Sequence, residues 1–149
     1  MRGSTIDILL VEDSPGDAKQ FQSFLKGDFA VSVARTGAEA LDKMFRRGKF
    51  AGEPVPDLVV LDLNLPLLSG LEVLNTVRNN SQISHIPVVV WSGSARQEDI
   101  SRAYEMGCCA YMIKRDSLED NEALLSAFSQ FWLEKIVFPQ RRTSAGTVS

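Results

Sequence analysis

Residues 58–66 read Leu-Val-Val-Leu-Asp-Leu-Asn-Leu-Pro, and this stretch decides the fold. Its first four residues form an unbroken apolar run, and so short a run indicates a strand that is buried on both faces. Strands of that kind are typical of parallel sheets. Asp62 follows the run directly, and open α/β sheets place their active sites just beyond the carboxyl ends of their strands. Asp62 is therefore the first candidate for a functional residue.

Three further apolar runs end in side chains that can take part in chemistry. These side chains are Glu12 and Asp13 after residues 6–11, Ser92 at the end of residues 88–92, and Lys114 after residues 110–113. The carboxyl ends of parallel strands meet at one edge of a sheet, so we expect all of these groups to share one cleft. An acidic residue after a single strand is often only part of a solvated turn. Their joint occurrence after four strands indicates a functional site.

Helical patterns alternate with strand patterns along the whole chain. A fifth strand is predicted at residues 30–34, and helices are predicted to open near Pro15, Thr36, Gly70, Gln97 and Ser117, the last running to about Val137. Strict alternation of strands and helices predicts an α/β fold in which helices cover both faces of a parallel sheet. We predict one domain over residues 6–138 and a flexible tail over residues 139–149.

Composition excludes several classes of protein. The chain has 149 residues and a formal net charge of -3, which argues against a nucleic-acid binder because such proteins need a basic surface. No apolar stretch approaches the roughly 20 residues that span a membrane, and the N-terminus lacks an apolar signal region. We therefore predict a cytoplasmic protein that does not enter membranes. Cys108 and Cys109 are neighbours and cannot staple distant segments, so no disulfide framework is expected.

The acidic residues predict a metal site. Three carboxylates in one cleft repel one another, so the cleft should bind a cation, and oxygen ligands favour Mg²⁺ or Mn²⁺. Asp13, Asp62 and the backbone carbonyl of Asn64 are the candidate direct ligands, and Glu12 could act through a bound water. With the charge of Lys114 added, the loaded site would be near neutral. A phosphoryl group could then approach Asp62, which would attack it as a nucleophile.

At these residues the chain resembles the receiver domain of two-component response regulators, over residues 6–137. Glu12 and Asp13 match the family's acidic pair and Asp62 matches its phosphoacceptor, while Ser92, Lys114 and Tyr111 match its switch hydroxyl, its lysine and its aromatic switch position. The resemblance implies a flavodoxin-like, doubly wound sheet of five parallel strands in the order 2-1-3-4-5. It also implies a phosphorelay protein that takes a phosphoryl group from a sensor histidine kinase and signals through protein contacts. Such a protein catalyses this transfer and its own slow dephosphorylation.

Two positions depart from that family's pattern. Ser92 stands where threonine is commoner, and it keeps the hydroxyl. Arg115 stands where the family usually has a proline after a cis peptide bond. A cis bond before a residue other than proline costs about 2.5–4 kcal/mol, so the Lys114–Arg115 bond is either trans or strained.

The C-terminal part of the chain carries a narrower resemblance. Residues 127–139 are similar to the end of phytochrome-associated single-domain response regulators, which implies a bacterial phytochrome as the kinase. Helical spacing of apolar residues in this segment also suggests more apolar surface than one small sheet can cover. We therefore predict a symmetric homodimer through Phe131, Trp132, Ile136 and Phe138.

Three other functions compete with this interpretation. A haloacid-dehalogenase-type phosphatase also places an aspartate after a strand, but it needs a second acid two residues later, where this chain has Asn64. An FMN-binding protein needs a phosphate-binding loop after the first strand, where Glu12 and Asp13 would repel phosphate. A receiver that signals without phosphorylation would not need the intact acidic site, although Arg115 keeps that alternative open.

Overall fold

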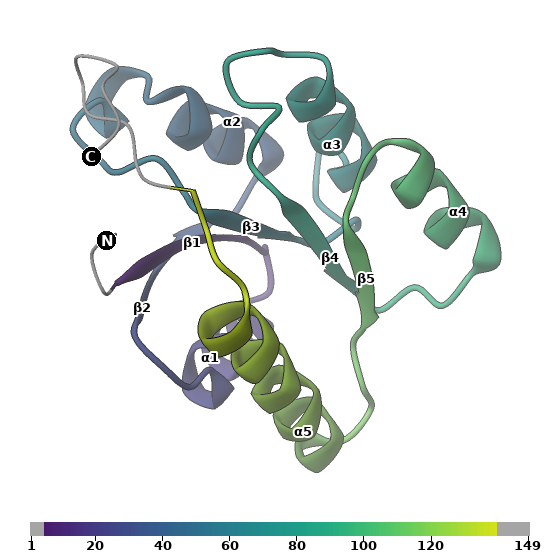
Figure 1. The fold of residues 1–149 in the computed structure, drawn as a ribbon. Helices are drawn as coiled ribbons and strands as arrows, with labels where there is room; N and C mark the ends of the chain where they lie inside the picture. Colours follow the sequence, from purple (N-terminus) through teal and green to yellow (C-terminus); the bar gives the residue numbers. More distant parts are fainter. Residues whose placement is uncertain (1–4, 140–149) are drawn as a thin grey trace.

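A computed structural model describes residues 5–139, in which five parallel strands form one sheet in the order β2-β1-β3-β4-β5 (Figure 1). The strands are β1 (Ile6–Val11), β2 (Phe29–Ala34), β3 (Leu58–Leu61), β4 (Val88–Ser92) and β5 (Ala110–Ile113). Both the predicted strand order and the parallel pairing are confirmed. β2 begins one residue before the predicted start at Ala30.

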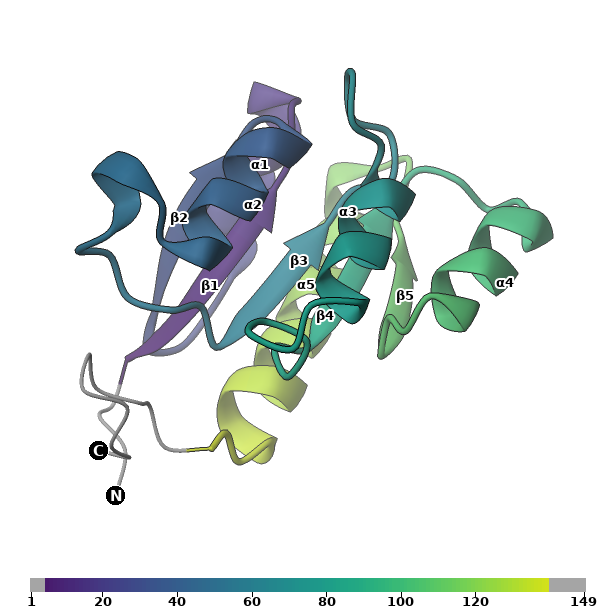
Figure 2. The ribbon, with the colours of Figure 1, turned by 90° about the horizontal axis from the view of Figure 1, so that it is seen from above.

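Helices cover both faces of the sheet. They are α1 (Pro15–Phe24), α2 (Gly37–Phe45), α3 (Gly70–Arg78), α4 (Gln97–Glu105) and α5 (Leu118–Ser129). Figures 1 and 2 show α1 and α5 on one face of the sheet and α2, α3 and α4 on the other. Of the five α-helices within residues 5–139, four open with a hydroxyl side chain that accepts the N–H of the residue three positions later. These cap residues are Ser14, Thr36, Ser69 and Ser117.

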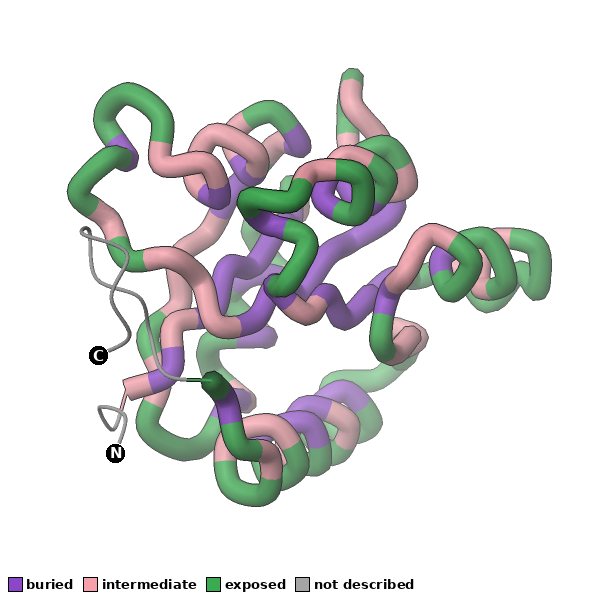
Figure 3. Tube along the Cα trace, turned by 45° about the horizontal axis from the view of Figure 1, so that its top comes forward, coloured by how far each residue is buried: buried purple, intermediate pink, exposed green. Residues whose placement is uncertain are grey.

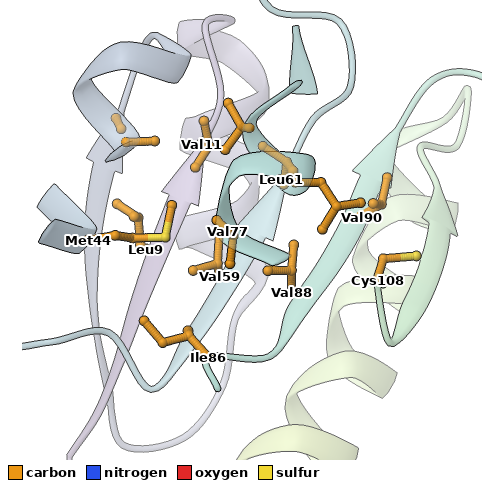
Figure 4. Close-up of a cluster of buried hydrophobic side chains, with 14 of the residues drawn as sticks. Leu9, Val11, Met44, Val59, Leu61, Val77, Ile86, Val88, Val90 and Cys108 are labelled. Atoms are coloured by element: carbon orange, nitrogen blue, oxygen red, sulfur yellow. The ribbon is translucent and has the colours of Figure 1, made fainter. Parts of the chain in front are cut away.

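The core consists of two layers because successive side chains of a strand point to opposite faces. One layer packs Leu9, Val59 and Leu61 against Met44 of α2 and Val77 of α3 (Figure 4). The central strands are buried along their length, while the outer faces of the helices are exposed (Figure 3). The sheet is therefore a rigid base for the residues that follow its strands.

Aromatic rings dominate the second layer, between the sheet and the pair α1 and α5. The ring of Phe21 lies 5.7 Å from that of Trp91 and 5.8 Å from that of Phe128, measured between centroids. All three side chains are at most 4% exposed. These contacts fix α1 and α5 against the strand that ends at Ser92.

The C-terminal helix ends earlier than the sequence predicts. After α5 the chain continues as π-helical turns over Gln130–Lys135, and Ile136 is already extended, with φ -91° and ψ 141°. The predicted end at Val137 is wrong by two residues. Ile136 and Val137 are β-branched and favour extended backbone, and Pro139 disfavours a helical conformation of the residue before it.

This early end changes the surroundings of the four predicted interface residues. Phe138 folds back onto the domain, where it is 7% exposed and its ring lies 6.3 Å from that of Trp132. The expectation that all four side chains extend beyond the core is therefore wrong for Phe138, which is a core residue. Trp132 and Ile136 are partly buried against the same layer, and only Phe131 is exposed, at 51%.

Two other expectations concern the ends of the chain and one peptide bond. No cis peptide bond occurs within residues 5–139, so the Lys114–Arg115 bond is trans. Apart from Pro139, the predicted tail lies outside the described residues. None of the helices in the described part of the chain is long and apolar enough to cross a membrane.

Candidate functional site

The predicted site residues meet at the carboxyl edge of the sheet. Glu12 follows β1 and Asp62 follows β3, and both are buried, at 1% and 5% exposure. Asp13 is exposed beside them. One carboxylate oxygen from each of these three residues lies within 4.8 Å of the others. The sequence thus predicted the three acids correctly as one cluster, although the strands that place them are far apart in the chain.

Lys114 lies at the centre of this cluster. Its Nζ is 2.9 Å from Oδ2 of Asp62 and 2.8 Å from Oε1 of Glu12. A third carboxylate also binds it, because Oδ2 of Asp17 lies 2.8 Å away. The backbone N–H of Lys114 donates to the carbonyl of Ser92 at 2.8 Å, which ties the end of β5 to the end of β4. All three N–H groups of the ammonium thus have a carboxylate within reach.

Asp17 is a site residue that sequence reasoning missed. It lies in the first turn of α1, and its N–H donates to Oγ of the cap residue Ser14. The sequence predicts the start of this helix near Pro15, and a helix that opens at this edge brings its first-turn carboxylate there as well. Asp17 adds a fourth negative charge. When all four acids are ionised, the site loaded with a divalent cation carries about one negative charge, which corrects the expected near neutrality.

The buried charges shift each other's protonation. Burial raises the pKa of Glu12 to about 7, the hydrogen bond from Lys114 opposes this, and the negative charge of Asp62 adds to it. Burial alone would lower the pKa of Lys114, but its hydrogen bonds to Asp17, Glu12 and Asp62 outweigh that effect and hold the pKa above the usual lysine range. Lys114 therefore stays charged at neutral pH, whereas Glu12 is partly protonated there.

The residues present fit a divalent cation. Every side-chain donor of the cluster is a carboxylate oxygen, which Mg²⁺ and Mn²⁺ prefer over nitrogen and sulfur. A single lysine does not balance four acids, so a cation would relieve the remaining repulsion. The N–H of Asn64 donates to Oδ1 of Asp62 at 3.1 Å, which orients that carboxylate. The carbonyl of Asn64 as a metal ligand stays a prediction.

Ser92 and Tyr111 are linked through one backbone residue. Ser92 is fully buried, and its Oγ accepts the N–H of Ser94 at 3.4 Å. The hydroxyl of Tyr111 donates to the carbonyl of the same Ser94 at 2.9 Å. Burial raises the pKa of Tyr111, so its hydroxyl remains a donor. A displacement of Ser92 would therefore move Ser94 and change the hydrogen bond of Tyr111. The switch role of Ser92 and Tyr111 stays a prediction.

The segment that follows Asp62 is held in place by Gly70. The N–H of Gly70 donates to the carbonyl of Leu63 at 3.0 Å. A Cβ at position 70 would lie 2.3 Å from the carbonyl oxygen of Asp62 and 2.5 Å from Cα of Leu63. Only glycine lets α3 begin this close to the end of β3, and this contact sets the backbone position of Asp62.

Relatives of known sequence share most of this chain. The family model for the response regulator receiver domain matches residues 8–127. Response regulator Rcp1 of Synechocystis sp. is 36% identical over 135 residues, which cover 89% of this chain and 92% of that protein. The probable methanogenesis regulatory protein FilR2 of Methanothrix harundinacea is 35% identical over 129 residues, which cover 85% of this chain and 83% of that protein.

Solved structures agree with this assignment. The phosphorylated cyanobacterial phytochrome response regulator RcpA has a TM-score of 0.87 at 32% identity, covering 91% of this chain and 99% of that one. The Mn²⁺-bound form of response regulator Rcp1 has a TM-score of 0.85 at 34% identity, covering 90% of this chain and 99% of that one. A divalent cation is therefore the cofactor that both the acidic cluster and the relatives support. By its fold, its acidic cluster and these relatives, the chain belongs to the family of response regulator receiver domains.

Proposed function

We propose that Asp62 of this receiver accepts a phosphoryl group from the phosphohistidine of a sensor histidine kinase. A carboxylate oxygen of Asp62 attacks the phosphorus, and the bond between phosphorus and the imidazole nitrogen breaks. Its electron pair stays with the imidazole, which takes a proton from solvent. The observation that carries the proposal is the buried Asp62 carboxylate, bound by Lys114 at 2.9 Å within the acidic cluster.

The other site residues support that transfer. Glu12, Asp13, Asp62 and the carbonyl of Asn64 would hold Mg²⁺ or Mn²⁺, which supplies positive charge to the phosphoryl oxygens. Lys114 can give one of its N–H groups to a phosphoryl oxygen as negative charge develops there. The Ser92 hydroxyl would donate to another oxygen in a charge-assisted hydrogen bond. Nothing in this set supplies the second acid of a phosphatase, because position 64 is an amide.

The kinase that we propose is a bacterial phytochrome. Two of the similar proteins are a cyanobacterial phytochrome response regulator and a bacteriophytochrome response regulator by name. The resemblance of residues 127–139 to the end of such regulators also favours this kinase. Histidine kinases use ATP, so we place the transfer in the cytoplasm.

Transfer between purified proteins tests this function. A bacteriophytochrome kinase, autophosphorylated with radiolabelled ATP, is mixed with the wild type and with Asp62→Asn. We expect the label to move to the wild type within the first minutes and not to Asp62→Asn. A kinase of a different sensory class serves as the control and should transfer more slowly. Equal labelling of both receivers would contradict Asp62 as acceptor, and faster labelling by the control kinase would contradict the phytochrome link.

We further propose that output passes through a homodimer formed at α5 and the π-helical segment that follows it. Phe131 is 51% exposed and lies edge-on to Trp132, with ring centroids 5.5 Å apart, and Val137 is 93% exposed. Exposed apolar side chains that lie together on one surface mark a candidate interaction site. Ile136, by contrast, packs partly into the core, so only part of the predicted interface set is free to contact a partner.

The dimer is tested with a charge at Phe131. In a two-fold dimer each substitution is introduced twice, so Phe131→Glu should yield a monomer by light scattering while Asp62 still accepts phosphoryl from acetyl phosphate. Leu118→Glu is the matched control, because Leu118 is 60% exposed at the opposite end of α5. A wild type that stays monomeric with and without phosphorylation would end the proposal, as would a dimer that Leu118→Glu disrupts and Phe131→Glu does not.

A further inference from the structure

One buried amide binds the peptide group that follows the site lysine. Asn121, in the first half of α5, is 6% exposed. Its Oδ1 accepts the N–H of Arg115 at 2.7 Å, and its Nδ2 donates to the carbonyl of Arg115 at 3.0 Å. Nδ2 also donates to Oε1 of Gln20 in α1 at 3.1 Å. One side chain thus satisfies both backbone polar groups of Arg115 and connects them to α1.

These hydrogen bonds fix the backbone torsions of Lys114. The N–H of Lys114 donates to the carbonyl of Ser92, which sets the peptide plane before Lys114 and thereby restricts its φ. The N–H of Arg115 belongs to the peptide plane after Lys114, so its bond to Asn121 restricts the ψ of Lys114. With both torsions held, the Cα–Cβ bond of Lys114 has one direction, toward the carboxylates. The lysine side chain is long and flexible, and its placement therefore depends on that direction.

The sequence around Arg115 matches this arrangement. A proline at this position would lack the N–H that Asn121 accepts, so the hydrogen bond requires another residue type. The Lys114–Arg115 bond is trans. Asn121 is also a polar residue on the buried face of α5, between Ser117 and Leu125, where an apolar side chain would serve packing better. This buried amide is stable there because its Oδ1 accepts one hydrogen bond and its Nδ2 donates two.

We propose that Asn121 is a positioning residue that holds Lys114 against Asp62, and that Gln20 orients Asn121 for this task. The inference rests on the proposed role of Lys114 in phosphoryl transfer. It adds a residue outside the acidic cluster to the machinery, and it explains how this chain places its lysine on a trans peptide bond. The hydrogen bonds of Asn121 go to Arg115 and Gln20 and to none of the carboxylates within residues 5–139, so we assign its effect to the backbone of Lys114.

Labelling kinetics give the first test. In Asn121→Leu, which keeps the branched shape of the side chain and removes the hydrogen bonds, we expect the maximal rate of Asp62 labelling by acetyl phosphate at saturating Mg²⁺ to fall about tenfold or more. Asn121→Asp keeps the acceptor for Arg115 and should recover part of the rate. Gln20→Leu keeps both hydrogen bonds between Asn121 and Arg115, so its labelling rate should fall the least of the three variants. If circular dichroism shows that Asn121→Leu is unfolded, Asn121→Ala takes its place in every comparison.

A double-mutant cycle separates positioning from a general structural role. If Asn121 acts through Lys114, Asn121→Leu should cause no further loss in a Lys114→Met background. Trp91 supplies a readout that needs no activity, because Nζ of Lys114 lies 5.1 Å from the centroid of the Trp91 ring. With Trp132→Phe in every variant, Asn121→Leu should shift the Trp91 emission in the same direction as Lys114→Met, and the two shifts should not add.

Two results would overturn the inference. One is that Asn121→Leu labels at the same rate as the wild type and shows the same Trp91 emission. The other is that the effects of Asn121→Leu and Lys114→Met add fully in the double variant, both on the labelling rate and on the Trp91 emission. A failure of the proposed function is recognised separately, because wild type and Asp62→Asn would then label alike whatever stands at position 121.

Discussion

The raised pKa of Glu12 predicts that metal binding depends steeply on pH around neutrality. The acid is 1% exposed, and burial is the largest cause of its pKa of about 7. A divalent cation binds the ionised cluster and so competes with the proton on Glu12. Affinity should therefore be fully developed above about pH 8 and should fall as the pH drops through the pKa. From about pH 8 to about pH 6 the ionised fraction of Glu12 falls about tenfold, so the Mg²⁺ dissociation constant should rise about tenfold.

Isothermal titration with Mg²⁺ measures this effect directly. Titrations in two buffers with different ionisation enthalpies also count released protons, and near pH 7 we expect roughly half a proton per bound ion. Glu12→Gln is the matched variant, because the amide keeps the shape of the side chain and cannot titrate. It should lose both the proton release and most of the pH dependence. A wild-type affinity that is constant over this range, or a Glu12→Gln variant with the same pH dependence, would refute this account of the buried acid.

Two further predictions concern the positions next to Asp62. Gly70→Ala should lower the free energy of unfolding by about 3 kcal/mol or more in urea titrations, because its Cβ would lie 2.3 Å from the carbonyl oxygen of Asp62. Gly93→Ala is the control, since position 93 has open space around it, and it should lower that free energy by less than about 1 kcal/mol. Equal costs would show that the close approach at Gly70 is not what limits the site. Ser92→Ala should still accept phosphoryl on Asp62 but lose the phosphorylation-induced change at Tyr111, measured by fluorine NMR of fluorotyrosine-labelled protein. The same spectral change in Ser92→Ala would exclude the coupling through Ser94.

Most of the site could be predicted because its signals are local. The apolar runs that make the strands are continuous in sequence, and the residue after each run lies at the carboxyl edge whatever the helices do. This rule predicts Asp62, Glu12 and Ser92. Lys114 was found by the same rule, and the structure adds only that it binds all of the neighbouring acids except the exposed Asp13.

The residues that were missed depend on contacts between distant parts of the chain. Asp17 meets Lys114 across 97 positions, and Asn121 meets Gln20 across 101. Neither contact produces a periodic pattern in the sequence. An acid in the first turn of a helix, such as Asp17, and an amide within a helix, such as Asn121, are residue types that usually lie on the surface. Phe138 was misassigned for the same reason, since helical spacing cannot show that the chain turns back onto the core after Lys135.

The most direct test of the central claim is the intact mass of the protein after incubation with acetyl phosphate and Mg²⁺. The wild type should gain the mass of one phosphoryl group, and the gain should disappear when Mg²⁺ is removed with a chelator. Asp62→Asn should gain nothing, while Asp17→Asn, which leaves the acceptor intact, should still be labelled. A phosphoryl group on Asp62→Asn, or more than one on the wild type, would contradict the assignment of Asp62 as the acceptor.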